Sequence, residues 1–238
     1  INLLLSNEIK SVQALDKIEV QLANDKLIEV ETLLAATGRN GNTQNLGVRD
    51  IGLNVGKRGY LGVNKKYQTE IKHIYAVGDV IGFPALASTA MEQARIAMVH
   101  AFHLEYKTEL ATVLPFGIYT IPECSVAGKT EQELAKENVS YIVGRADFSE
   151  NARGQIIGEE DGLLKLLFRK NDMKLLGVHI IGESASELIH VGLTALLLGA
   201  NAELFIQTCY NYPTLTEVYK YATYDALGNL ANNKYTLR

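Results

Sequence analysis

Two short hydrophobic runs lie near the start of the chain, at residues 18–22 and 27–36. Both have the length and composition of strands, and Asn24-Asp25 between them predicts a hairpin turn. Residues 37–42, Thr-Gly-Arg-Asn-Gly-Asn, are typical of a loop. This stretch is too short to bury a core of its own. We therefore interpret residues 1–40 as the end of a domain.

A different pattern follows between residues 41 and 110. Residues 74–77, Ile-Tyr-Ala-Val, have the composition of a short buried strand, and they stop at Gly78-Asp79. From residue 86 to about residue 104 good helix formers continue with no glycine or proline, which predicts a long helix. A strand, a Gly-Asp turn and a helix together indicate an α/β unit. Open α/β sheets place their ligands at such turns, beyond the carboxyl ends of the strands.

The third region, from residue 111 to residue 238, alternates strand-like and helix-like patterns. Thr130 and Glu133 stand at the spacing of a capping box, and Asn171-Asp172 is a good hairpin turn. The pattern predicts strands at 113–120, 139–148, 163–168 and 175–181, and helices at 130–138, 184–198 and 214–227. An antiparallel sheet with helices on one side is an α+β domain. We therefore expect an α/β segment (41–110) followed by an α+β domain (111–238).

Composition narrows the class of protein. Hydrophobic residues make up 47% of the chain and charged residues 21%, as in ordinary globular proteins, and the net charge of −4 argues against a nucleic-acid partner. No apolar run approaches the roughly 20 residues that cross a bilayer. Cys124 and Cys209 are far apart, which favours a reducing cytoplasm over a disulfide framework. His100 and His103 have helical spacing but lack a third ligand nearby, so no metal site is predicted.

Gly78-Asp79 is the first candidate for chemistry. Gly and Asp are common in ordinary turns, but a carboxylate at a strand end can also accept hydrogen bonds from sugar hydroxyls. Thr69 with residues 74–80 is similar to the second flavin-binding motif of the two-dinucleotide-binding-domain flavoproteins, the glutathione reductase and dihydrolipoamide dehydrogenase class. This resemblance implies that Asp79 binds the ribityl chain of FAD beside Gly78. It also implies that Leu86 and Ala87 open a helix near the flavin ring.

The resemblance extends over most of the chain. Residues 36–39 resemble the segment where this family's chain leaves its NAD(P) domain and returns to its FAD domain, which implies that Gly38 and Arg39 are cofactor-binding residues. Residues 177–182 and 185–189 look like a strand and an interface helix of the family's dimerisation domain. The implied domains are the end of an NAD(P)-binding domain (1–40), the end of an FAD-binding Rossmann-like domain (41–110) and a dimerisation domain (111–238). The implied assembly is a homodimer or a higher homo-oligomer.

The segment 209–217 separates the activities within this family. The disulfide reductases carry a histidine just before the proline and a glutamate five positions beyond that histidine. Here Tyr212 stands at the histidine position, while Glu217 is present. A phenol with a pKa near 10 is a poor proton shuttle for a thiol at neutral pH. Residues 211–214 are similar to those of the family's soluble transhydrogenases. The resemblance therefore implies hydride transfer between NADPH and NAD⁺ through FAD, with Tyr212 and Glu217 at the catalytic site.

Several alternatives stay open on the sequence. Tyr212 and Glu217 could simply pack at a subunit interface, or Glu217 could be a favourable charge in the first turn of a helix. A dihydrolipoamide dehydrogenase-like disulfide reductase is the competing enzyme. A mercuric-reductase-like role is disfavoured because the tail from Asn229 onwards has no cysteine pair. The chain starts at Ile1 and contains neither of the family's two glycine-rich dinucleotide motifs. We expect a truncated product, inactive alone, and acting in the extreme case only as a dimerisation module.

Overall fold

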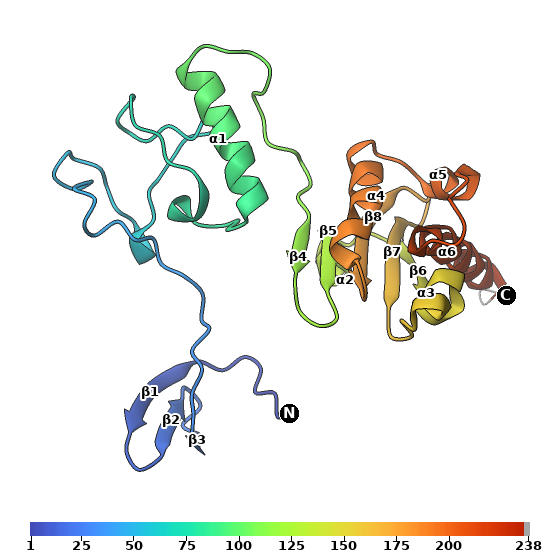
Figure 1. Ribbon diagram of the computed structural model, residues 1–238, viewed down its shortest axis with the longest axis horizontal. Helices are drawn as coiled ribbons and strands as arrows, with labels where there is room; N and C mark the ends of the chain where they lie inside the picture. The colour runs from blue at the N-terminus through green and yellow to red at the C-terminus, as the bar shows by residue number, and fades with distance from the viewer. Residues whose placement is uncertain (236–238) are drawn as a thin grey trace. The chain divides into compact units, whose positions relative to one another are not determined.

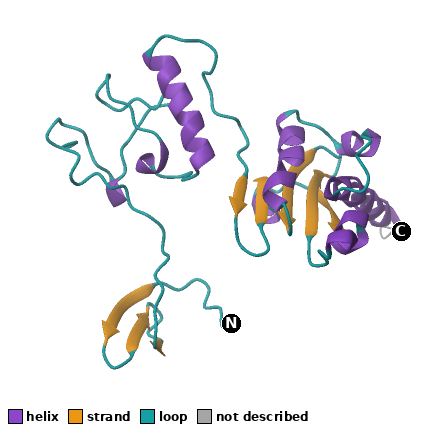
Figure 2. Ribbon diagram, in the orientation of Figure 1, coloured by secondary structure: helices purple, strands orange, loops and turns teal. Residues whose placement is uncertain are grey.

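The computed structural model describes residues 1–235 and divides the chain into two compact units, residues 1–60 and the residues from 61 onwards (Figures 1 and 2). The first unit contains an antiparallel sheet of β1 (Ile9–Ala14), β2 (Ile18–Leu22) and β3 (Leu27–Val30), in that order. The hairpin at Asn24-Asp25 is confirmed, with the Leu22 N–H donating to the Lys26 carbonyl. A short 3₁₀ turn, η1 (Lys57–Gly59), closes this unit.

The third strand of this sheet ends earlier than the sequence predicts. Val30 pairs with Ile18, the first residue of β2, so β2 has no further backbone groups to offer residues 31–36. The predicted extension to residue 36 is therefore wrong. β1 was not predicted: all six of its residues are exposed, and such a strand leaves a weak hydrophobic signal.

The segment before Gly78 also differs from its prediction. Residues 74–77 are extended but form no strand; Tyr75 makes an isolated bridge with Gln68. A strand needs a neighbouring strand to satisfy its backbone groups, and within the described residues Gln68 is the bridge partner. The Gly-Asp turn itself is a 3₁₀ turn, η2 (Gly78–Ile81). The predicted long helix is confirmed as α1 (Ala87–Ala101), which ends where His103 adopts a left-handed conformation at φ 56°.

The carboxyl-terminal sheet confirms the predicted α+β class. Its five strands run in the order β4-β5-β8-β7-β6, and every neighbouring pair is antiparallel. The strands are β4 (Phe116–Ile118), β5 (Cys124–Gly128), β6 (Tyr141–Asp147), β7 (Leu163–Arg169) and β8 (Leu175–Ile181). The helical elements are α2 (Glu131–Lys136), η3 (Phe148–Glu150), α3 (Ala152–Ile157), α4 (Ala185–Leu197), α5 (Ala202–Gln207), η4 (Leu215–Glu217) and α6 (Val218–Tyr235).

One face of this sheet carries the core. Alternate residues of β7 and β8, such as Leu166 and Val178, are fully buried there, as the period of two in a strand requires. α4 covers β5 and β8, and α6 covers β6 and β7 (Figure 1). Contrary to the expectation of helices on one side only, α2 lies over the opposite face, where Glu131 pairs with Lys165 at 2.9 Å. β5, α3 and α5 were not predicted, because each is five or six residues long.

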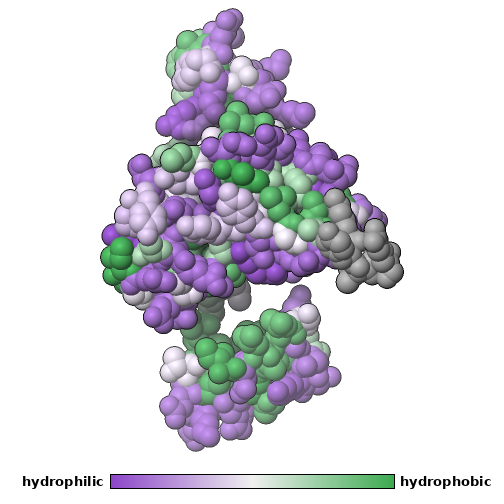
Figure 3. All heavy atoms as spheres, turned by 90° about the vertical axis from the view of Figure 1, so that its right-hand side faces the viewer, coloured by the Kyte–Doolittle hydropathy of each residue, from purple (hydrophilic) through white to green (hydrophobic). Residues whose placement is uncertain are grey.

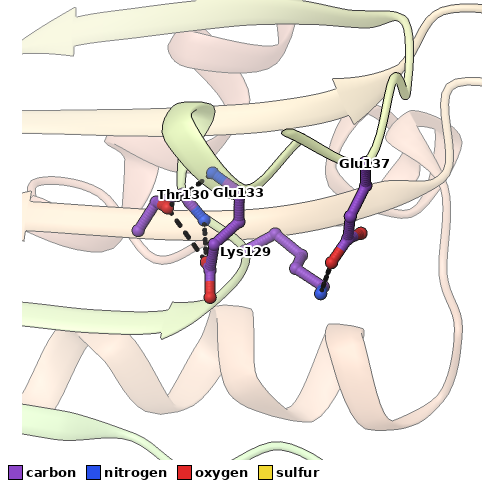
Figure 4. Close-up of polar contacts among 4 residues, drawn as sticks. All are labelled: Lys129, Thr130, Glu133 and Glu137. Carbon is purple, nitrogen blue, oxygen red and sulfur yellow. Dashed lines mark hydrogen bonds and ion pairs between the residues drawn. The ribbon is translucent and has the colours of Figure 1, made fainter. Parts of the chain in front are cut away.

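The predicted capping box at α2 is confirmed (Figure 4). The Glu133 N–H donates to the Thr130 hydroxyl at 3.2 Å, and the Glu133 carboxylate accepts from the Thr130 N–H at 2.8 Å. An ion pair between Lys129 and Glu137 spans the same helix. These bonds satisfy backbone donors that the first turn of a helix leaves without partners.

His179, on the face of the sheet that α2 covers, makes stability depend on pH. Its Nε2–H donates to the Lys129 carbonyl, and burial lowers its pKa below the ordinary 6.5; the charges of Lys165, Glu131 and Glu133 also act on it. The unfolded chain then binds the proton more readily than the fold does. Stability from this group is complete above about pH 6.5 and decreases as the pH falls through the folded pKa.

We therefore expect a His179→Gln variant, which keeps an N–H donor, to lose less stability between about pH 7 and about pH 5 than the parent chain. Urea unfolding at both pH values measures the difference. An equal loss in both proteins would mean that His179 is not held in its neutral form by the fold.

Candidate functional site

The Gly78-Asp79 turn has a backbone conformation that favours glycine. Gly78 has a φ of 75°, and its N–H donates to the Oε1 of Gln93 at 2.7 Å. Gln93 lies on α1 and is 2% exposed. A Cβ at position 78 would lie 3.2 Å from the Cβ of Ala90 on the same helix. The turn is thus held tightly against α1, while the Asp79 carboxylate faces solvent.

The amino-terminal end of α1 offers backbone donors. Leu86 is the N-cap, with an extended backbone and no side-chain cap, and Ala87 is exposed. The first N–H groups of a helix lack intrahelical partners, and the helix dipole there favours negative charge. A pocket of about 360 Å³ lies beside this end and is also lined by Tyr119, Ser186 and His190. Tyr119 follows β4, whereas Ser186 and His190 both lie on α4, and the sequence analysis assigned none of the three to a cofactor site.

Gly38 and Arg39 lie in the first unit. Gly38 has a φ of 94°, and the Arg39 carbonyl accepts a hydrogen bond from the Tyr60 hydroxyl at 2.8 Å. Close by, the Gly41 N–H donates to the Arg58 carbonyl at 2.7 Å. These bonds hold the ends of the 39–60 segment together. The other four residues expected at the cofactor, namely Gly78, Asp79, Leu86 and Ala87, belong to the second unit.

Tyr212 and Glu217 lie at the start of the last helix. Tyr212 is 72% exposed, and Glu217 ends the turn η4. The Tyr221 hydroxyl donates to the Oε1 of Glu217 at 3.4 Å. The Oε2 of Glu217 is buried and has no hydrogen-bond partner within the part of the chain that the structure describes. Burial raises the pKa of Tyr221, and the charge of Glu217 raises it further.

The sequence analysis missed Tyr221, although a helix beginning near Glu217 places residues four apart on one face. It also gave no role to Gln93, which the structure places under the Gly78 turn. Across the described residues 1–235 there is no group of three His, Cys, Asp or Glu side chains arranged to hold a metal ion. In the same residues no helix has both the length and the apolar character needed to cross a membrane.

Two family models match the chain in succession. The pyridine nucleotide-disulphide oxidoreductase model matches residues 1–94, and the dimerisation-domain model of the same family matches residues 114–223. The chain belongs to the pyridine nucleotide-disulphide oxidoreductase family. The predicted fold class, an α/β dinucleotide-binding part followed by an α+β dimerisation domain, agrees with this membership.

Curated relatives of this chain are soluble pyridine nucleotide transhydrogenases. The one from Mycobacterium tuberculosis (strain ATCC 25177 / H37Ra) is 47% identical over 209 residues, which is 88% of this chain and 44% of the relative. The one from Yersinia enterocolitica (serotype O:8 / biotype 1B) is 46% identical over 218 residues, 90% of this chain and 47% of the relative. The chain therefore spans about half the length of these relatives.

Solved structures of the family share the fold. LpdA from Mycobacterium tuberculosis superimposes with a TM-score of 0.76 at 27% identity, covering 92% of this chain and 48% of LpdA. The HOCl-induced flavoprotein disulfide reductase RclA from Escherichia coli gives a TM-score of 0.80 at 20% identity, over 91% of this chain and 50% of RclA. At that identity the second likeness concerns the fold alone.

Proposed function

We propose that this chain is part of an FAD-dependent transhydrogenase that moves hydride between NADPH and NAD⁺. Tyr212 carries the proposal, because the disulfide reductases that the chain resembles have a histidine at this position. The names of the curated relatives support the same activity. A tyrosine hydroxyl keeps its proton at neutral pH, so it can donate a hydrogen bond but does not serve as the base for a dithiol.

The residues around Gly78 are suited to hold FAD. The left-handed glycine lets a ligand approach the backbone, the exposed Asp79 carboxylate can accept hydrogen bonds from ribityl hydroxyls, and the uncapped end of α1 favours a partial negative charge. Leu86 and Ala87 would then line the flavin ring beside the pocket at this end. FAD, when bound, supplies the capacity to accept hydride from one nicotinamide and donate it to another.

The other predicted site residues have supporting roles in this proposal. Gly38 and Arg39 carry the chain out of the NAD(P)-binding domain, which gives proposed domains of 1–40, 41–110 and 111–238. Glu217 accepts a hydrogen bond from Tyr221 and follows Tyr212 by five positions at the start of the last helix. Tyr212, which is exposed, would donate a hydrogen bond from its hydroxyl to the reacting nucleotide.

We further propose a cytoplasmic homodimer or higher homo-oligomer formed through the dimerisation domain. Hydrophobic side chains are exposed among hydrophilic ones on the face seen in Figure 3. Leu197 on α4 is 47% exposed, and Tyr224 on α6 is 49% exposed. Exposed apolar side chains on the domain that matches the dimerisation model are available for contact with a second copy. Two free cysteines, Cys124 and Cys209, fit a reducing compartment.

Assay of the protein expressed from its complete gene tests the activity. We expect rapid NADPH-dependent reduction of an NAD⁺ analogue and no reduction of lipoamide or glutathione disulfide. A Tyr212→Phe variant should lower the kcat of hydride transfer about tenfold, since it removes one hydrogen bond worth about 1.4 kcal/mol. Asp161→Asn, at an exposed turn, is the control variant and should keep the parent rate.

Rapid disulfide reduction would instead identify the protein as a disulfide reductase with an unusual base. Absence of both activities, together with absence of flavin absorbance, would identify a dimerisation module. An unchanged kcat in Tyr212→Phe would remove Tyr212 from the catalytic site while leaving the transhydrogenase activity in place.

A further inference from the structure

The loop that carries Tyr212 is fixed at both ends and exposed in the middle. Before it, Tyr210 packs against the hydrophobic core, and the ammonium of Lys220 lies 5.9 Å from the centre of its ring. After it, Leu215 is 8% exposed and belongs to the core. Between them Tyr212 projects into solvent. The orientation of Tyr212 therefore depends on how the backbone of this short loop is held.

A buried side chain from a distant segment contacts this loop. The Nδ2 of Asn151 donates to the Thr214 carbonyl at 3.1 Å, and Asn151 is 1% exposed. The Thr214 hydroxyl in turn donates to the carbonyl of Asn211 at 2.7 Å. The contact thus reaches from Asn151 through Thr214 to the residue that precedes Tyr212.

The other end of the Asn151 amide is also occupied. Its Oδ1 accepts from the backbone N–H groups of Arg153 at 2.9 Å and Gly154 at 3.1 Å, so Asn151 is the N-cap of α3. Backbone N–H groups only donate and a carbonyl only accepts, so the amide has one orientation that satisfies all three bonds. Gly154 has no room for a side chain, because a Cβ there would lie 1.9 Å from the Phe148 carbonyl oxygen. The first turn of α3 therefore packs directly against η3, and its N–H groups hold the Asn151 side chain in place.

From this geometry we propose that Asn151 is a positioning residue for Tyr212. Its Oδ1 caps α3, and its Nδ2 donates to the Tyr212 loop, so the same side chain fixes the start of α3 and the backbone of the loop. The inference rests on the role of Tyr212 in the proposed function. Asn151 itself touches neither substrate nor cofactor in this proposal; it acts by limiting the directions that the Tyr212 side chain can take.

Aspartate at position 151 separates the two tasks of the amide. Asn151→Asp keeps a side-chain oxygen for the N-cap, where aspartate performs as well as asparagine, but loses the donor and places a carboxylate against the Thr214 carbonyl. Asn151→Ser, which also caps helices but is shorter, is a second variant should the first fold poorly. Asn201→Asp is the matched control: Asn201 caps α5 by accepting from the Glu203 N–H at 3.1 Å, at the end of α5 that is farther from this loop along the chain.

Two measurements on the protein expressed from its complete gene test the proposal. The first is hydrogen exchange of the backbone amides of residues 209–215, which reports on the loop without any turnover. We expect exchange about tenfold faster in Asn151→Asp and unchanged exchange in Asn201→Asp. Unchanged loop exchange in both folded Asn151 variants would overturn the proposal.

The second measurement is a double-mutant cycle on the kcat of hydride transfer. We expect Asn151→Asp to lower kcat about fivefold with KM values unchanged, and to have no further effect in a Tyr212→Phe background. An equal loss in both backgrounds would mean that Asn151 does not act through Tyr212, which overturns its positioning role. A third outcome is an unchanged kcat in Tyr212→Phe together with faster loop exchange in Asn151→Asp. In that case the role assigned to Tyr212 is wrong, and the Asn151–Thr214 hydrogen bond has only a structural role.

Discussion

Replacing Gly144 by alanine is expected to destabilise the carboxyl-terminal domain by about 3 kcal/mol, one of the largest effects of any single methyl group in this chain. Gly144 lies on β6 directly beneath α6. A Cβ at this position would lie 1.9 Å from the carbonyl oxygen of Ala222 and 2.8 Å from the Cβ of Ala226. Both alanines are fully buried, so the helix has to move away from the sheet to admit the methyl group.

Gly228 on the same helix provides the matched control. It is exposed, and a Cβ there would meet no atom within 4 Å. Gly228→Ala should therefore stabilise the protein by about 0.5–1 kcal/mol, because alanine loses less backbone entropy than glycine when a helix forms. Urea unfolding of the two variants gives both values. A Gly144→Ala variant as stable as the parent would show that α6 does not pack this closely on β6.

Asp79→Ala is expected to weaken FAD binding about 10- to 100-fold, since a hydrogen bond to a charged group is worth about 1.5–3 kcal/mol. The Asp79 carboxylate is exposed beside Gly78. Because glycine has no side chain, a ligand can approach the backbone of this turn closely. The substitution leaves the Gly78–Gln93 hydrogen bond in place, because that bond uses the Gly78 backbone. The loss should therefore fall on the ligand and not on the fold.

Flavin content of the protein expressed from its complete gene measures this effect. Visible flavin absorbance relative to protein, before and after dialysis, should decrease in Asp79→Ala and stay at the parent level in Asp161→Asn. The unfolding midpoint of the flavin-free protein should be the same in all three. Full flavin retention in Asp79→Ala would show that this carboxylate does not contact the ribityl chain.

Local rules explain why much of the fold could be predicted from the amino-acid sequence. The capping box at Thr130 and Glu133, the hairpin between β7 and β8, and the helix α4 each depend on residues within a few positions of one another. The family resemblance at Gly78-Asp79 is equally local, and the family models agree with it. The positions of Tyr212 and Glu217 next to one proline are likewise visible in the sequence itself.

Contacts between distant segments were decided by the tertiary structure. The pattern at residues 74–77 indicated a strand, but a strand forms only where another backbone lies alongside, and here Tyr75 meets Gln68 in a single bridge. β5 sits between β4 and β8 because of sheet topology, which a five-residue pattern does not encode.

The same reason explains what the sequence did not reveal about the candidate site. The sequence analysis predicted neither α3 nor its cap Asn151. The bond from Asn151 to a carbonyl 63 residues away exists only because η3 and η4 are brought together in the folded domain. The sequence thus determined the family, the local elements and the residue types of the site. The tertiary structure determined which distant side chains hold the candidate site residues in place, because a hydrogen bond requires two atoms to meet in space whatever their separation along the chain.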